Sequence, residues 1–161
     1  RDSEKTVQLQ KDASRLGVST IETRTADLNL PLSAALTEKF DHVLVDAPCS
    51  GTGTLGRNPE IRWRLAPADI QMHSKTQKTI LHHAADAVKK GGRLIYCTCS
   101  VLAQENDDVI RHFLKDNPEF IVDAPPTDIP DALTDSRGFF RTYPHRHAMD
   151  GFFGAILKRR I

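Results

Sequence analysis

The amino-acid sequence predicts an α/β domain with a mostly parallel sheet, and three observations support this prediction. Short apolar stretches typical of buried strands alternate along the chain with longer amphipathic stretches typical of helices. The segments between them are short, as they are in proteins whose helices cover a parallel sheet. The chain has 161 residues, of which 39% are hydrophobic, so its size fits one domain with its own core.

The N-terminal part of the chain is predicted to form a helix followed by a strand. Residues 2–16 place Ala13 and Leu16 at helical spacing, and Gly17 follows where a left-handed C-terminal cap is expected. Residues 18–25 are rich in β-branched side chains, which favours a strand. This strand is expected to join the same sheet as the strands further along the chain.

The middle of the chain is predicted to supply two buried strands and the helix between them. Residues 41–46 and 93–98 are short apolar runs of the length that buried strands have. Between them, a long amphipathic helix is predicted to begin at Pro67 and to extend as far as Val88. The glycine pair at 91–92 is expected to end that helix before the second strand begins.

The C-terminal part is predicted to contain a helix and a closing pair of antiparallel strands. Acidic residues load the first turn of this helix near Glu105, Phe113 lies on its apolar face, and Pro118 follows its end. Residues 139–143 and 152–158 are predicted to pair as antiparallel strands.

Charge and hydropathy limit the classes of partner. The chain has 22 Lys and Arg against 21 Asp and Glu, so no bulk field draws it onto a polyanion, which must be bound locally. Acids dominate residues 105–135 and bases dominate 141–160, a segregation that most often marks a solvated face. No apolar run approaches the ~18 residues of a membrane span, and the charged N-terminus is unlike a signal peptide. We therefore expect a cytoplasmic protein with no membrane partner.

The three cysteines are candidates for chemistry because they are too few, and odd in number, for a disulfide framework. Cys49 and Cys99 follow two different predicted strands, at the sheet edge where α/β proteins bind ligands, and Asp46 comes with them. A thiolate there would be a soft nucleophile. The alternative, a small buried apolar side chain, is favoured for Cys97, which lies inside its strand. No metal site is expected, because no Cys-x-x-Cys pair exists.

Four motifs together resemble one known family. They are Asp46-Ala47-Pro48-Cys49-Ser50-Gly51-Thr52-Gly53, Thr98-Cys99-Ser100, Glu105-Asn106 and Asp150-Gly151-Phe152-Phe153. In this order and spacing they resemble the Sun (Nop2/Sun, RsmB-like) family of RNA cytosine-5 methyltransferases. The resemblance covers nearly the whole chain. It implies the Rossmann-like class I methyltransferase sheet, mostly parallel with a C-terminal antiparallel strand pair, and S-adenosylmethionine as the methyl donor.

The resemblance also implies roles for single residues. Cys99 matches the family's nucleophile, whose thiolate adds to carbon 6 of cytosine so that carbon 5 can accept the methyl group. Asp46 matches the carboxyl group that stabilises this adduct at N3 and the exocyclic amine, and Cys49 matches a second cysteine tied to release. Asp27, together with Asp46 and Pro48, is expected beside the cofactor. The alternative for Asp27 is an ordinary turn aspartate.

RNA is the expected partner, with ribosomal RNA as the first candidate and tRNA as the alternative. Bacterial small-subunit enzymes of the family tend to end soon after the Asp150 motif, as this chain does. Five basic residues are candidates for RNA contact: Arg57, Arg62, Arg64, Arg141 and His145. Trp63 lies between two of these arginines and is either a stacking surface for a base or a packing anchor.

The sequence departs from the family pattern at its N-terminal end. The family's glycine-rich cofactor loop and ribose-binding acid belong to two strands that are expected before residue 1. Residues 1–161 are therefore expected to be the C-terminal portion of the catalytic domain, with its N-terminal strands missing and little cofactor affinity of its own. Strand edges left beside residues 18–25 and 42–46 are expected to favour self-association.

Two other functions stay open at this stage. A catalytically silent fragment that binds RNA or another protein would carry the same motifs. A hydrolase with a cysteine and histidine pair would use His73, His82 or His83, but these residues lie on a helix that is predicted to pack against the sheet. Strand ends, where the cysteines lie, are therefore the better place to expect the chemistry.

Overall fold

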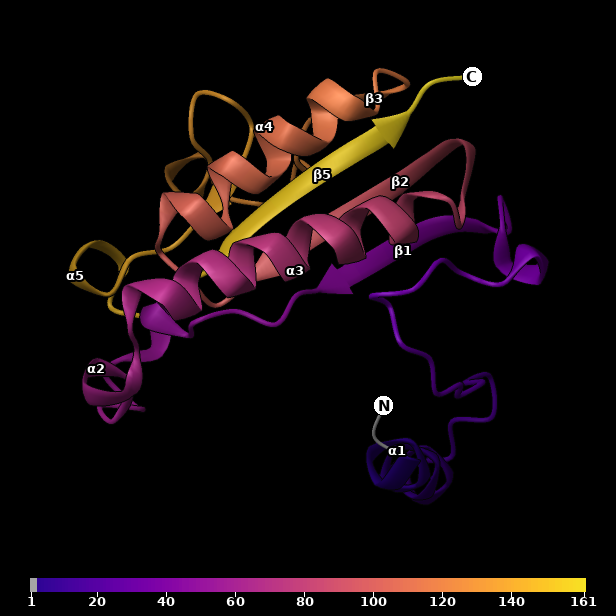
Figure 1. The fold of residues 1–161 in the computed structure, drawn as a ribbon, viewed down its shortest axis with the longest axis horizontal. Helices are drawn as coiled ribbons and strands as arrows, with labels where there is room; N and C mark the ends of the chain where they lie inside the picture. The colour runs from indigo at the N-terminus through magenta and orange to yellow at the C-terminus, as the bar shows by residue number, and fades with distance from the viewer. Residues whose placement is uncertain (1–2) are drawn as a thin grey trace.

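In the computed structural model, which describes residues 3–161, a five-stranded mixed sheet carries two long helices (Figure 1). The helices are α1 (Ser3–Arg15), α2 (Ile61–Arg64), α3 (Pro67–Ala85), α4 (Asp107–Asp116) and α5 (Pro144–His147). The strands are β1 (Phe40–Asp46), β2 (Val88–Thr98), β3 (Phe120–Val122), β4 (Phe140–Arg141) and β5 (Phe153–Arg159). None of the helices in these residues is both long and apolar enough to cross a membrane.

The sheet joins a parallel strand pair to antiparallel neighbours. Its order is β1-β2-β5-β3, and β4 pairs with β5 away from this path. β1 and β2 run parallel, with Asp46 opposite Cys97, whereas β5 runs antiparallel to β2, β3 and β4. The predicted α/β class is confirmed, and so is the antiparallel pairing near the C-terminus, but within residues 3–161 the sheet is mixed and only β1 and β2 pair in parallel. Because β1 and β2 run the same way, their carboxyl ends lie at one edge of the sheet.

The core lies between the sheet and the helices α3 and α4, which lie side by side (Figure 1). Their predicted apolar faces are confirmed, since both helices turn fully buried side chains toward the strands. These core residues include Ile80, Leu81 and Ala84 of α3, Val109, Ile110 and Phe113 of α4, and Leu94, Tyr96, Phe153 and Leu157 of the strands. At about 1.5–3 kcal/mol for each large apolar side chain, this burial fixes the sheet edge that carries the cysteines.

The boundary between α3 and β2 differs from the prediction. The helix ends at Ala85 rather than near Val88, and β2 begins before the glycine pair instead of after it. The chain can turn so early because backbone groups of residues 38–40 donate to carbonyl groups of residues 86 and 87. Gly92 then passes close to β1, where a Cβ atom would lie 2.8 Å from the Asp41 carbonyl oxygen.

The predicted strand over residues 18–25 is wrong, because this segment is irregular in the structure. The helix before it is confirmed as α1, with Gly17 in the left-handed conformation at its end. Its first predicted residue, Asp2, lies outside the described residues. The segment runs beside α1, away from the sheet (Figure 1), and Ile21 is 46% exposed. β-branched residues favour a strand only where a neighbouring strand completes the hydrogen bonds, and no described strand does so here.

Candidate active site

Two loops meet beyond the carboxyl ends of β1 and β2. The first follows Asp46 and carries Cys49, and the second follows Thr98 and carries Cys99. The structure brings the two thiols into contact, with their Sγ atoms 3.4 Å apart. Both side chains are half-buried. Residues 50 positions apart in the sequence therefore form one pair at the edge where this class of fold binds its ligands.

A close approach of three backbone segments holds these loops together. The Gly53 amide donates to the Cys99 carbonyl oxygen at 2.9 Å, and the Gly151 amide donates to the Gly53 carbonyl oxygen at 2.8 Å. A Cβ atom on Gly53 would lie only 1.9 Å from the Gly151 carbonyl oxygen. Glycine is required at this position, and three of the four sequence motifs converge there.

The fourth motif lies beneath the loops as a buried carboxylate. Glu105 is fully buried, and its Oε1 accepts hydrogen bonds from the Ser50 amide at 2.8 Å and from Gln77 Nε2 at 3.2 Å. Its Oε2 accepts from the hydroxyl groups of Ser50 and Ser100, each at 2.5 Å. Each of these serines directly follows one of the paired cysteines in the sequence. The carboxylate therefore bonds to both cysteine loops.

Burial makes the Cys49 thiol a weak acid. Loss of hydration, with smaller effects from the neighbouring Cys99, raises the pKa of Cys49 to about 12. Cys49 therefore keeps its proton near neutral pH, and its thiol can donate toward the sulfur of Cys99. Burial, with Asp46 as the next cause, likewise raises the pKa of Cys97 to about 11. Its Sγ lies 3.5 Å from the Val45 carbonyl oxygen, within the strand, as the sequence predicted.

Two of the three residues predicted to line the cofactor site share one cavity, and the third, Asp27, does not. Asp46 and Pro48 border a cavity of about 450 Å³ at the open edge of β1. Its lining is mostly apolar and includes Leu28, Leu32, Leu36, Phe40, Leu44, Ile80 and Ala84. Asp27 is not part of this lining, and its Oδ1 accepts hydrogen bonds from the backbone and side-chain nitrogens of Asn29 at 3.1 and 2.9 Å. This is the turn geometry that the alternative interpretation of Asp27 describes.

Three of the predicted RNA contacts cluster on and before α2. Trp63 is 77% exposed, so it is not a packing anchor, and the Arg62 guanidinium lies 6.0 Å from its ring centroid. Arg64 is exposed on the same short helix. Arg57 forms an ion pair with Asp150 but stays largely exposed. Exposed arginines around an exposed indole form a surface suited to phosphates and bases.

The other two predicted RNA contacts are placed differently. The Arg141 side chain is only 13% exposed, and it forms ion pairs with Asp135 at 2.8 Å and with Asp107 at 2.7 Å. Its guanidinium also lies 4.7 Å from the centroid of the Phe153 ring. Its donors thus serve contacts within the chain. His145 is exposed on α5, beside Tyr143.

Two residues of the site, Glu105 and Gln77, have no role in the sequence prediction, although Glu105 belongs to one of the four motifs. Glu105 was expected in the first turn of a solvated helix, but it lies in a 3-10 turn (Ala103–Glu105) ahead of α4. Gln77 is fully buried on α3, where its Nε2 donates to the Pro48 carbonyl oxygen at 2.9 Å. A polar residue at a core position of an apolar helix face was the available signal.

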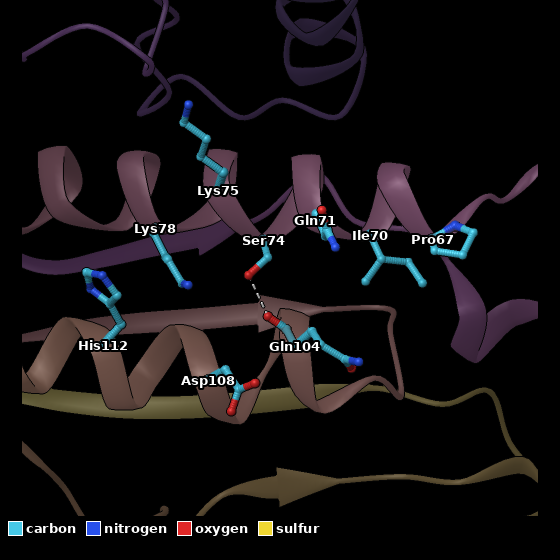
Figure 2. A pocket seen from close by; sticks show the side chains of 9 residues that line it. All are labelled: Pro67, Ile70, Gln71, Ser74, Lys75, Lys78, Gln104, Asp108 and His112. Carbon is cyan, nitrogen blue, oxygen red and sulfur yellow. Dashed lines mark hydrogen bonds between the residues drawn. The ribbon is translucent and has the colours of Figure 1, made fainter.

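A separate groove of about 610 Å³ lies between α3 and α4 (Figure 2). Lys75, Lys78 and His112 line it together with Asp108, and none of the predicted site residues does. One contact links this groove to the cysteine loops: the Ser74 hydroxyl donates to the Gln104 carbonyl oxygen at 2.7 Å (Figure 2). Gln104 directly precedes Glu105 in the chain.

Comparisons with known proteins point to one family. Residues 1–158 match the family described as "16S rRNA methyltransferase RsmB/F". The chain is 40% identical over 157 residues to the "Probable ribosomal RNA small subunit methyltransferase B" of Synechocystis sp., covering 94% of this chain and 35% of that protein. It is 40% identical over 136 residues to the mouse "28S rRNA (cytosine-C(5))-methyltransferase", covering 74% of this chain and 17% of that protein.

A solved structure gives the same result for the fold. The crystal structure of PH0851 superposes with a TM-score of 0.89 at 37% identity, covering 98% of this chain and 35% of that one. The chain therefore spans about a third or less of the length of these relatives.

Proposed function

This chain belongs to the RsmB/F family of 16S rRNA methyltransferases, and on that premise we propose that it carries the reacting groups of an RNA cytosine-5 methyltransferase. The observation that supports this most directly is the 3.4 Å contact between Cys49 and Cys99 at the carboxyl ends of two parallel strands. The proposed substrate is ribosomal RNA, since relatives at this level of identity are named for it.

In the proposed reaction Cys99 is the nucleophile. Its thiolate forms a bond to carbon 6 of the target cytosine, and the electron pair of the carbon 5 to carbon 6 double bond is displaced into the ring. Asp46 stabilises this charge by hydrogen bonding at N3 and the exocyclic amine. Cys49 is suited to a different task, because burial raises its pKa and keeps its thiol protonated.

The second half of the reaction restores the aromatic ring. Bound S-adenosylmethionine would supply the methyl group to carbon 5, and the bond between that group and the cofactor's sulfur would break. A base then takes the proton from carbon 5, the electron pair of that bond re-forms the double bond to carbon 6, and Cys99 leaves carbon 6 as a thiolate. We assign Cys49 to this release step because it touches Cys99 and shares a loop with Asp46.

The residues of this chain fit one part of S-adenosylmethionine. The cavity at the open edge of β1 is apolar enough for an adenine ring and is bordered by Asp46 and Pro48. Asp46 would thereby lie between the cofactor and the base. Asp27 would need to leave its turn with Asn29 to take part.

For the RNA we propose a path over α2. Trp63 would stack on a base, and Arg62 and Arg64 would contact phosphates.

A second copy of the chain is a further proposed partner. It would pair through β1, which lies at the edge of the sheet and exposes 65% of Leu44.

Replacing the nucleophile tests the proposed function. Cys99→Ala in the longest protein that the gene encodes should lower methyl transfer from labelled S-adenosylmethionine to ribosomal RNA by about 10³-fold or more. It should also abolish the covalent adduct with RNA that contains 5-fluorocytidine, in which carbon 5 has no proton to lose. Cys97→Ser is the matched control and should retain both signals. A Cys99→Ala enzyme that still methylates RNA would refute the assignment.

A further inference from the structure

We propose that Glu105 is a positioning residue that holds Cys49 and Cys99 in contact. Its meaning for catalysis rests on the proposed function, but the contact itself does not. Glu105 is fully buried and lies outside both cysteine loops, yet its carboxylate bonds to each of them. No reacting group of the mechanism above requires it.

The two carboxylate oxygen atoms of Glu105 accept hydrogen bonds from different kinds of donor. Oε1 faces two N–H donors, the Ser50 amide and Gln77 Nε2, and so must act as an acceptor. Oε2 accepts from the hydroxyl groups of Ser50 and Ser100, whose own oxygen atoms are 3.5 Å apart. Because both hydroxyl groups bond to one oxygen atom, the residues that follow Cys49 and Cys99 are held side by side.

The backbone that carries Glu105 is itself fixed from two sides. The Ser74 hydroxyl of α3 bonds to the carbonyl group just before Glu105, as Figure 2 shows. From the sheet, the Tyr96 hydroxyl donates to the Glu105 carbonyl oxygen at 2.6 Å. The next residue, Asn106, donates to the Ser100 carbonyl oxygen at 2.8 Å. The carboxylate is thereby presented to the loops from a rigid support.

Stability alone is a weak explanation for this carboxylate. Within residues 3–161, Glu105 forms no ion pair with Lys, Arg or His, and burial of an unpaired charge is costly. Its four hydrogen bonds only offset that cost. The arrangement is better explained by the geometry that the four bonds impose on the loops.

Variants of Glu105 that change either the length or the charge of the side chain can separate a positioning role from an effect of charge. Glu105→Asp keeps the charge but shortens the side chain by about 1.5 Å, so it cannot reach both serines from the same backbone position. Glu105→Gln keeps the length, an acceptor toward Ser50 N and Gln77, and a polar atom toward the two hydroxyl groups. A positioning role predicts that Gln rescues and that Asp does not.

The test measures how fast Cys49 and Cys99 form a disulfide in this chain. The background variant Cys97→Ser leaves these two thiols alone, and diamide is the oxidant. The two thiols lose two protons and two electrons, the sulfur atoms become bonded, and the N=N bond of diamide is reduced to the hydrazine. The time course is followed by mass spectrometry of peptides, and needs neither RNA nor cofactor.

We expect Glu105→Asp and Glu105→Ala to slow disulfide formation by at least about tenfold, because a shift of about 1 Å is enough to cost that much. Glu105→Gln should stay within about threefold of the parent. Phe120→Ala makes a cavity at the opposite end of the sheet, controls for lost stability, and should also keep the parent rate.

Three outcomes would overturn the proposal. They are parent rates in both Glu105→Asp and Glu105→Ala, a Gln variant as slow as the Asp variant, and a Phe120→Ala variant as slow as either. A failed methylation assay would refute the proposed function and leave this order of rates untouched, so the two failures can be told apart.

Discussion

The two sides of the β1 carboxyl end are built in opposite ways. On the side toward β2, the loops that carry Cys49 and Cys99 are held by buried hydrogen bonds from Ser50 and Ser100 to Glu105 and by backbone contacts at Gly53. On the open side, Leu44 is 65% exposed and borders an apolar cavity, with no described strand beside it. The comparison teaches that the groups proposed to react are positioned by this chain alone. The surface proposed for the cofactor is apolar, and this chain leaves it exposed.

The largest effect on the cysteine side is expected from removal of the Cys49 thiol. Cys49→Ala should accumulate a covalent adduct between protein and RNA, because attack by Cys99 would continue while release fails. The adduct is measured as a slow band on a denaturing gel. The band should vanish in the double variant Cys49→Ala, Cys99→Ala, and its persistence there would mean that the two roles are assigned wrongly.

Asp46 lies where the two sides meet, and its charge can be tested separately from its shape. Asp46→Asn should lower the rate of methyl transfer by about 10²–10³-fold, equivalent to about 2.7–4 kcal/mol, because a charge-assisted hydrogen bond is lost. Single-turnover kinetics with saturating RNA give this rate. A loss smaller than tenfold would point to another residue as the stabilising group.

The pH dependence of alkylation tests whether burial raises the pKa of Cys49 on the cysteine side. Because the pKa of Cys49 is raised to about 12, the reactive thiolate is a small fraction at neutral pH and grows as pH rises. Alkylation of Cys49 by iodoacetamide should therefore increase about tenfold per pH unit between about pH 7 and pH 9. Site-resolved mass spectrometry measures it, and a plateau within this range would contradict the burial argument.

The smallest effect is expected on the open side. Leu44→Lys places a charge on the exposed edge strand and should weaken self-association, with the free energy of unfolding changed by less than about 0.5 kcal/mol. Light scattering over a concentration series reports the first quantity and urea unfolding the second. An equal substitution on α4, Leu114→Lys, is the contrasting control, because Leu114 packs against the core and its loss should destabilise the fold. A parent chain that stays monomeric would remove the self-association proposal.

The same contrast explains what could be predicted from the sequence. Local signals were sufficient for the apolar faces of α3 and α4 and for the strand ends that bring Cys49 and Cys99 together. Residues 18–25 have the composition of a strand, but a strand also needs a neighbour, and local composition carries no information about that. The early end of α3 likewise depends on distant backbone donors from residues 38–40.

Contacts between residues that are distant in the sequence also determine where individual charged side chains lie. Glu105 and Arg141 have the sequence signature of solvated charges, yet one is buried beneath the cysteine loops and the other lies between Asp107 and Asp135. The position of Glu105 depends on Ser50, more than 50 residues away in the sequence, and that of Arg141 depends on Asp107, more than 30 residues away. A sequence pattern read over one or two turns cannot detect partners at such distances.

The exposed indole on α2 gives the protein a built-in optical reporter. Trp63 is the only tryptophan of the chain and is 77% exposed, so intrinsic emission comes from one known position on the proposed RNA path. Stacking of a base on that ring would quench its fluorescence, whereas binding elsewhere would leave it unchanged. An unlabelled titration thus reports where an RNA lands as well as whether it binds.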